Sequence, residues 1–342
     1  MKMKIIDATI LSRRDTGVAR GIRQIIISRS GRKDYIMLVN KHFNIPGIYR
    51  KVMLPFSHIG PVRFIYQIFL MPFILAYFKA EWYVSPTHIL PLFKYGKYLA
   101  VAHDMMLYRV KGKYPFFKSL LYHFYYLLTY SNADVLVTSS ENSRNEIAAF
   151  SKKRVFIVRL KVQLDLDVNK PLYALLGKKF ILTVGSLEKG KNIGLLVKAY
   201  ALLPEALRRE YELVITGKNV NSSDELTKLV RSAGIGNSTS FTGFVTDPEL
   251  IWLYRNCSLF VFPSLYEGFG FPVIEALACG AKVIASDTSS IPEILRNPAY
   301  RFSPYVPEDL SSLMRRMLTD REFSSDYTRW LGEEKEFLKK YF

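Results

Sequence analysis

The stretch SLYEGFGFPVIEALACG (264–280) decides the fold of this chain. It overlaps the end of the apolar run LFVFPS (259–264), which predicts a buried strand, and it continues into a short helical pattern closed by Gly280. The glycines in between let the backbone approach a ligand closely. Pro272 fits the first position of a helix. The stretch therefore predicts a strand, a glycine turn and a helix that begins directly behind the turn.

A helix that begins at such a turn is predicted to bind an anion, because its free N–H groups and its dipole point at the ligand. Glu267 stands in the loop before the helix, and Glu275 lies about one turn inside it. Two carboxylates beside a phosphate cradle can bind hydroxyl groups on both sides of a diphosphate, those of a sugar and those of a ribose. Without the glycine turn, the same pair would be interpreted as a cap and a surface side chain.

The second half of the chain alternates strand and helix patterns on either side of this stretch. The expected strands are residues 180–185, 211–217, 239–245, 259–264 and 281–286, and the expected helices are 192–203, 223–234, 247–257 and 272–280. In the helix at 247–257, Asp247 is the expected cap and Pro248 the first helical residue. This alternation predicts a parallel sheet with helices on both faces, whose ligands bind at the carboxyl ends of the strands.

The first half predicts a second α/β domain. Strand patterns occur at 4–10, 35–40, 81–85, 97–103 and 133–140, and the join to the second half falls at about 160–175. Two helical stretches, 63–78 and 114–130, are rich in aromatic residues; they fit either a buried core or a membrane-facing surface. A length of 342 residues agrees with two or three domains.

The positive charge is concentrated in the first half. Residues 1–172 contain 27 Lys and Arg against 10 Asp and Glu, whereas residues 173–342 contain 21 against 20. Such asymmetry indicates a polyanionic partner for the first half, namely anionic lipid, nucleic acid or a phosphorylated acceptor. Cys257 and Cys279 have no metal-ligand spacing and fit small buried side chains in a reducing, cytoplasmic setting.

With its glycine turn, the Glu267–Glu275 pair resembles the motif of the retaining GT-B glycosyltransferases of family 4, also described as glycosyl transferases group 1. The resemblance is strong over 180–294 and weaker over 1–172. It implies an α/β protein of GT-B fold, with two Rossmann-like parallel-sheet domains facing across a cleft. The implied parts are an acceptor-binding domain at 1–170, a nucleotide-sugar-binding domain at 171–320, and a C-terminal helix at 321–342 packing back on the first domain.

The resemblance also implies roles on the donor side. Glu267 would contact the hydroxyls of the donor sugar and Glu275 the ribose. The backbone of Gly268, Phe269 and Gly270 would contact the sugar and phosphates. In VGSLEKGKNIGLL (184–196), Lys191 matches the family's phosphate-binding lysine. At the positions where many relatives carry a second basic residue nearby, this chain has Ser186 and Gly190, and Lys189 is a candidate substitute.

Further positions match the family less specifically. Gly217 and Lys218 end a strand where the base pocket of the family begins, and Val245 would pack on the base or else in the core. In YLAVAHDMMLY (98–108), His103 would lie beside the donor sugar or else be a satisfied loop histidine. In RDTGVARGI (14–22), Gly17 resembles the glycine loop that faces acceptor and donor phosphate.

The implied function is retaining transfer of a hexose or deoxyhexose, with mannose as one candidate, from a nucleotide sugar to a lipid-linked or cell-surface polysaccharide. His103, Glu267 and Lys191 are the expected catalytic residues. No metal or cofactor is expected, and the Asp-x-Asp at 165–167 is discounted because it lies in the linker. The expected location is cytoplasmic, on the inner face of an anionic membrane, without nucleic acid.

Two other functions remain open. A nucleotide-sugar epimerase on the same fold would consume the donor without an acceptor. A non-catalytic nucleic-acid-binding protein would use the positive first half, although no recognised nucleic-acid module is present.

Overall fold

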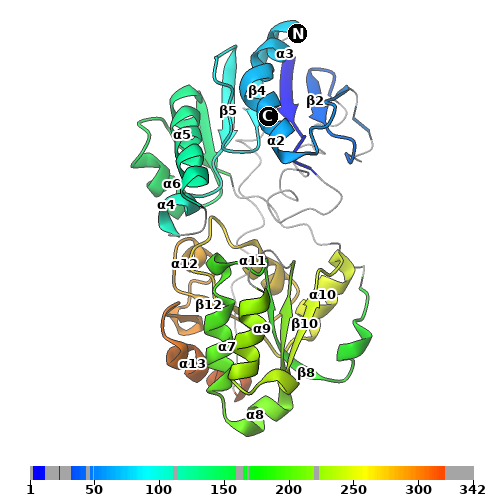
Figure 1. Ribbon diagram of the computed structural model, residues 1–342, viewed down its shortest axis with the longest axis vertical. Helices are drawn as coiled ribbons and strands as arrows, with labels where there is room; N and C mark the ends of the chain where they lie inside the picture. Colours follow the sequence, from blue (N-terminus) through cyan, green and yellow to red (C-terminus); the bar gives the residue numbers. More distant parts are fainter. Residues whose placement is uncertain are drawn as a thin grey trace. The chain divides into compact units, whose positions relative to one another are not determined.

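The structure, a computed structural model, describes residues 3–11, 23, 32–43, 47–48, 50–110, 115–158, 165, 167, 169–218 and 223–319. The chain divides into two units, one containing Met1–Lys161 and the other Val162–Leu331 (Figure 1). Each unit has one parallel sheet, so the predicted class of two Rossmann-like α/β domains is confirmed. The exact domain limits stay a prediction, and both the expected helix at 321–342 and Gly17 lie outside the described residues.

The second unit is built on a six-stranded sheet in the order β10-β9-β8-β11-β12-β13. Its strands are β8 (Lys179–Val184), β9 (Tyr211–Thr216), β10 (Thr239–Gly243), β11 (Leu259–Phe262), β12 (Val283–Ser286) and β13 (Arg301–Phe302). All neighbouring strands pair in parallel. The central strand β11 is apolar and buried along its whole length because both of its faces are covered.

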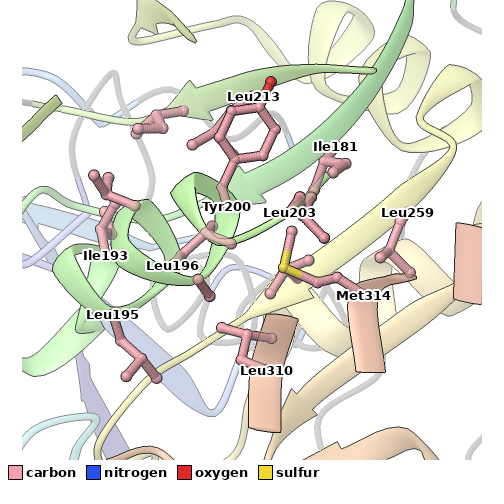
Figure 2. Packing of buried hydrophobic residues seen from close by; sticks show 14 of the residues in the cluster. Ile181, Ile193, Leu195, Leu196, Tyr200, Leu203, Leu213, Leu259, Leu310 and Met314 are labelled. Atoms are coloured by element: carbon pink, nitrogen blue, oxygen red, sulfur yellow. The ribbon is translucent and has the colours of Figure 1, made fainter. Parts of the chain in front are cut away.

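Helices cover both faces of this sheet, as the alternation predicts. One core contains α7 (Ile193–Ala201), α9 (Ser223–Ser232) and α13 (Pro307–Thr319), and the other contains α10 (Asp247–Asn256), α11 (Phe271–Ala278) and α12 (Ile291–Ile294). Alternate residues of one strand enter opposite cores; Ile181 and Leu182 of β8 are an example. Figure 2 shows Ile181 packed with residues of α7 and α13, among them Leu196 and Met314. The short α8 (Glu205–Glu210) leads into β9.

Helix α10 corrects one detail of the predicted caps. The N-cap is Thr246 rather than Asp247, and Pro248 is the second helical residue. The reason is a capping box, in which the Thr246 main-chain N–H donates to Glu249 at 2.8 Å. Glu249 also pairs with Lys170 at 2.9 Å. Together the bonds from Thr246 and Lys170 lower the pKa of Glu249 to about 2.

The first unit is built on a seven-stranded sheet in the order β3-β2-β1-β4-β5-β6-β7, again with parallel neighbours. Its strands are β1 (Met3–Asp7), β2 (Tyr35–Val39), β3 (Lys51–Met53), β4 (Ala80–Ser85), β5 (Lys97–Val101), β6 (Val135–Thr138) and β7 (Val155–Ile157). The described helices that join them are α2 (Gly60–Ile65), α3 (Met71–Tyr77), α4 (Met106–Arg109), α5 (Phe116–Asn132) and α6 (Glu141–Ala148). The short edge strands β3, β7 and β13 were not expected from the sequence.

Helices α2 and α3 form one continuous helix, Gly60–Tyr77, through a π-helical turn at Tyr66–Leu70. The turn ends two residues before Pro72, whose ring and missing N–H disturb regular α-helical bonding. By length and composition this helix could cross a membrane, a test that core helices also pass, and 28% of it is buried inside the protein. Ile68, Met71 and Leu75 are at most 2% exposed and pack against the sheet, so one side of the helix belongs to the core while the other side is open.

Candidate donor-binding site

The carboxyl edge of the second sheet gathers the loops in which the sequence predicts a site. Strands β8, β9, β11 and β12 run parallel, so the loops that follow them leave the sheet at the same edge. The glycine turn with Glu267 follows β11, and the short turn containing Lys191 follows β8. Because β8 and β11 pair directly, these two loops are neighbours.

Lys191 and Glu267 form an ion pair in this edge. Lys191 Nζ lies 2.6 Å from Glu267 Oε1, and the side chains are 17% and 10% exposed. The lysine stem passes over Gly185, where an added Cβ would contact Lys191 Cγ and Cδ at 3.5 Å. Its ammonium group also lies 5.5 Å from the centre of the Phe262 ring. The pair therefore holds a cation and a carboxylate, 76 residues apart in sequence, at one place.

The glycine turn has the geometry that the sequence predicts. Gly270 has φ of 97°, a conformation that favours glycine, and an added Cβ would lie 2.9 Å from Ile291 Cδ1, so the Ile291 side chain would have to shift. The sequence predicts Pro272 as the first residue of the helix. Helix α11 begins one residue earlier, at Phe271, so Pro272 is its second residue. Proline is tolerated there because the first N–H groups of a helix have no partner inside it. The Phe269 side chain is 5% exposed and packs in the core, which leaves only its backbone for a ligand.

Three hydroxyl residues after β12 hold the turn, and sequence reasoning missed them. Ser290 donates to the main-chain oxygens of Glu267 and Phe269 at 3.0 Å, and the Glu267 N–H donates to Ser289 Oγ at 2.8 Å. Thr288 donates to the Leu265 carbonyl oxygen at 3.1 Å. The run SDTSS at 286–290, directly after a predicted strand, is the signal that could have pointed to them. These bonds determine where the Glu267 carboxylate stands.

Glu275 lies one turn inside α11, as expected, but it is a buried residue. It is 4% exposed, and the hydroxyl of the fully buried Tyr254 donates to its Oε2 at 3.1 Å. Tyr254 comes from α10, and nothing in the sequence distinguishes it from an ordinary core aromatic residue. A buried carboxylate is costly unless it is hydrogen-bonded, and the Tyr254 hydroxyl supplies one such bond.

The predicted base-binding residues divide into two groups. Gly217 has φ of 150°, and an added Cβ would lie 1.7 Å from the Gly185 oxygen, so it belongs to the same tight edge as Lys191. Lys218 is exposed, and its carbonyl oxygen accepts a hydrogen bond from the Leu187 N–H at 3.0 Å. Val245 is half-buried and packs against the core. The contacts therefore connect Gly217 through Gly185 to Lys191 and Glu267, whereas no such contact is described for Lys218 or Val245.

His103 belongs to the first unit, where it follows β5 and is partly exposed. Its ring Nε2 lies 2.8 Å from the Pro86 carbonyl oxygen. Asp165 and Asp167 are exposed, and in the described part of the chain no group of three or more His, Cys, Asp or Glu could hold a metal ion. Cys257 and Cys279 are free thiols, and burial raises the pKa of Cys279 to about 11.

Comparison with known sequences and structures agrees with this geometry. Residues 170–330 match the family model described as glycosyl transferases group 1. The serotype-specific mannosyltransferase WbdA of Escherichia coli is 33% identical over 245 residues, which cover 66% of this chain and 30% of WbdA. The O-antigen chain mannosyltransferase B of Escherichia coli is 31% identical over 218 residues, which cover 60% of this chain and 57% of that protein. The chain thus spans between 30% and 57% of the length of these relatives.

Two solved structures match nearly the whole chain. Sucrose-phosphate synthase from Thermosynechococcus elongatus has a TM-score of 0.72 at 18% identity, with 94% of this chain and 90% of that chain covered. WaaG, a glycosyltransferase involved in lipopolysaccharide biosynthesis, has a TM-score of 0.72 at 15% identity, with 93% and 91% covered. At these identities the likeness concerns the fold, and it confirms the GT-B architecture. Residues 170–330 thus match the glycosyl transferases group 1 family, and the chain has the two-domain GT-B fold.

Proposed function

We propose that this chain is a retaining glycosyltransferase that moves a hexose or deoxyhexose, mannose being the first candidate, from a nucleotide sugar to a lipid-linked or cell-surface polysaccharide. One observation carries the proposal, namely that Lys191 and Glu267 meet at a glycine turn on the carboxyl edge of the sheet, with Glu275 in the helix behind it. The match of residues 170–330 to group 1 and the similarity to two Escherichia coli mannosyltransferases support it.

In the proposed reaction the bond between C1 of the donor sugar and the phosphate oxygen breaks, and an acceptor hydroxyl oxygen forms the new bond to C1 from the same face. The proton of that hydroxyl passes to the departing phosphate oxygen. Lys191 and the main-chain N–H groups at the start of α11 stabilise the negative charge of the departing diphosphate. We assign Glu267, which is paired with Lys191 at 2.6 Å, to the binding of sugar hydroxyls rather than to attack on C1. The proposed reaction requires no metal or cofactor.

A thermal-shift screen across nucleotide sugars tests the donor first, because a ligand that binds only the folded protein raises its stability. Transfer of labelled sugar to a lipid-linked acceptor, with the anomeric configuration of the product determined by NMR, then tests the reaction. Glu267→Gln should lower the transfer rate about 100-fold, as loss of one preorganised polar group does in other enzymes. Glu205→Gln, at a 66% exposed side chain on α8, is the matched control and should be active.

Three results would contradict the proposal. Donor turnover that yields an epimerised nucleotide sugar without an acceptor would favour an epimerase. A product of inverted configuration would exclude retention. Binding of duplex DNA without affinity for any nucleotide sugar would favour the non-catalytic alternative.

The first unit offers a surface for the proposed location on an anionic membrane. Every fourth residue of the helix Gly60–Tyr77 from Ile65 onward is an exposed apolar side chain, and α5 has a similar outer stripe. We call these residues the aromatic face: Ile65, Phe69, Phe73, Tyr77, Phe116, Phe117, Leu120, Leu121, Phe124 and Leu127. The two helices are neighbours, since the rings of Phe64 and Tyr125 meet edge to face at 4.4 Å. Neither helix contains Asp or Glu, and this half of the chain has the positive excess.

An exposed apolar face without acidic residues suits insertion at an anionic lipid surface, with basic residues as the electrostatic attraction. Phe73 and Phe117 are 70% and 83% exposed, so Phe73→Ser with Phe117→Ser should abolish co-sedimentation with anionic vesicles without unfolding the protein. Tyr305→Ser is the matched control, because Tyr305 is 76% exposed on the second unit. If the unsubstituted protein stays in the supernatant with anionic vesicles at low salt, the membrane proposal is wrong.

A further inference from the structure

Two histidines connect the ends of neighbouring strands in the first unit. Strands β4 and β5 pair in parallel, with Ser85 opposite Ala100. The segments that follow them, Pro86–His88 and His103, therefore leave the sheet at the same edge. Their rings meet with centroids 6.0 Å apart.

Two hydrogen bonds join the segments in opposite directions. The His103 main-chain N–H donates to His88 Nε2 at 3.2 Å, and the His103 ring Nε2 lies 2.8 Å from the Pro86 carbonyl oxygen. Helix α5 holds His88 from behind. There, Tyr126 contacts its ring at 4.5 Å between centroids, and the Thr129 hydroxyl donates to the His88 carbonyl oxygen. His88 is thus held at both its ring and its main chain.

These partners determine which ring nitrogens carry protons. A carbonyl oxygen can only accept, so the Nε2 of His103 is the donor in its bond to Pro86. A main-chain N–H can only donate, so the Nε2 of His88 is an acceptor. A neutral imidazole carries one N–H, which leaves a lone pair on the Nδ1 of His103. Within the described ranges no residue bonds to this Nδ1, and His103 is partly exposed.

The surroundings favour the neutral form of both rings. Burial lowers the pKa of His88 well below its ordinary value, and His103 lowers it further. Burial also lowers the pKa of His103 and outweighs the bond to Pro86 and the carboxylate of Asp104, both of which raise it.

We propose that His88 is a positioning residue: by anchoring the main chain of His103, it keeps the His103 ring bonded to Pro86 and its Nδ1 available to accept a hydrogen bond from a hydroxyl of the sugar substrate. The identity of that hydroxyl rests on the proposed function. The arrangement of the two rings is a property of the free protein and can be measured without a substrate.

Two substitutions of His88 separate the effect of its acceptor nitrogen from the effect of its size. His88→Gln keeps an acceptor near the position of Nε2, whereas His88→Phe keeps a ring of similar size and removes the acceptor. The tautomers are measured by ¹⁵N NMR of the ring nitrogens in the free protein. The chain has five histidines, and the His103 signals are identified by their absence from His103→Gln.

We expect His103 to be the neutral Nε2–H tautomer at pH 7 in the unsubstituted protein and in His88→Gln, and a mixture of tautomers in His88→Phe. A cationic or Nδ1–H His103 in the unsubstituted protein overturns the proposal, and so does an unchanged tautomer in His88→Phe. The tautomer of His103 in the unsubstituted protein tests the proposal even if His88→Phe does not fold.

Kinetics add a readout that a purely structural role would not change. In His88→Phe, kcat should fall about tenfold, the value of one lost hydrogen bond in the transition state, with little change in KM for the donor. His88→Gln should recover most of that loss, and failure to do so would contradict the positioning role. If no nucleotide sugar is turned over at all, the proposed function fails, while the NMR result still decides the histidine arrangement.

Discussion

Removal of the Lys191 ammonium group should destabilise the second unit before any ligand is added. In Lys191→Ala the Glu267 carboxylate, whose side chain is 10% exposed, loses its cation at 2.6 Å. Breaking a fully buried pair in this way costs about 3–5 kcal/mol. Since 17% of the lysine side chain still contacts water, we expect a smaller loss of about 2 kcal/mol in the free energy of unfolding. For a unit of this size that is a fall of roughly 4–8 °C in Tm.

A double-mutant cycle assigns this loss to the ion pair. Lys191→Ala, Glu267→Ala and the double substitution are compared by thermal unfolding, with Lys198→Ala, at an exposed lysine of α7, as the control. The sum of the losses in unfolding free energy of the two single variants should exceed the loss in the double variant by at least about 1 kcal/mol, which is the coupling energy. Coupling below about 0.3 kcal/mol would mean that the pair does not stabilise the free protein, and it would refute the reasoning. Lys191→Ala should also lose the thermal shift caused by a nucleotide sugar, whereas Lys198→Ala should keep it.

Three more predictions concern the same unit. Gly217→Ala should lower the free energy of unfolding by more than about 3 kcal/mol, because the added Cβ would lie 1.7 Å from a carbonyl oxygen. Gly236→Ala is the control: its added Cβ would have no neighbouring atom within 4 Å, so the same thermal assay should show almost no change. Tyr254→Phe should lower the free energy of unfolding by about 1–3 kcal/mol and weaken nucleotide binding in calorimetry, because buried Glu275 loses a hydrogen-bond donor. Unchanged stability and affinity would contradict this prediction. The pKa of Glu249 in the folded protein is about 2, below its ordinary value of about 4.5. The stabilisation by the Glu249 carboxylate is therefore complete above pH 4.5 and is lost as the pH falls towards 2. Glu249→Gln should flatten the curve of stability against pH in that range.

Much of the second unit could be predicted because its patterns are local. The strand that precedes the glycine turn and the helix that follows it were placed to within one or two residues, since apolar periodicity and helix-end residues act over short distances. The start of α10 was misplaced by one residue, because the capping box depends on where the Thr246 and Glu249 side chains point. Strands β3 and β13 were missed because each has only two or three residues at the edge of a sheet.

The candidate site was predicted by residue type but not by contact. Lys191 and Glu267 were each assigned to the donor, yet their pairing across 76 residues could not be inferred from either motif. Tyr254 and Ser290 were missed, because a core tyrosine and a loop serine carry no local sign that they hold a carboxylate or a turn. Whether these residues bind a nucleotide sugar stays a prediction.

The sequence by itself determined the alternation of strands and helices, the glycine turn ahead of a helix, and the charge difference between the two halves, because each depends on neighbours in the chain. Only the tertiary structure decided that Lys191 neutralises Glu267, that one side of the helix Gly60–Tyr77 is core and the other open, and that His88 is bonded to His103. Those facts depend on which strands lie side by side in a sheet. Pairing between strands distant in sequence is settled by packing of the whole core, which a local pattern does not specify.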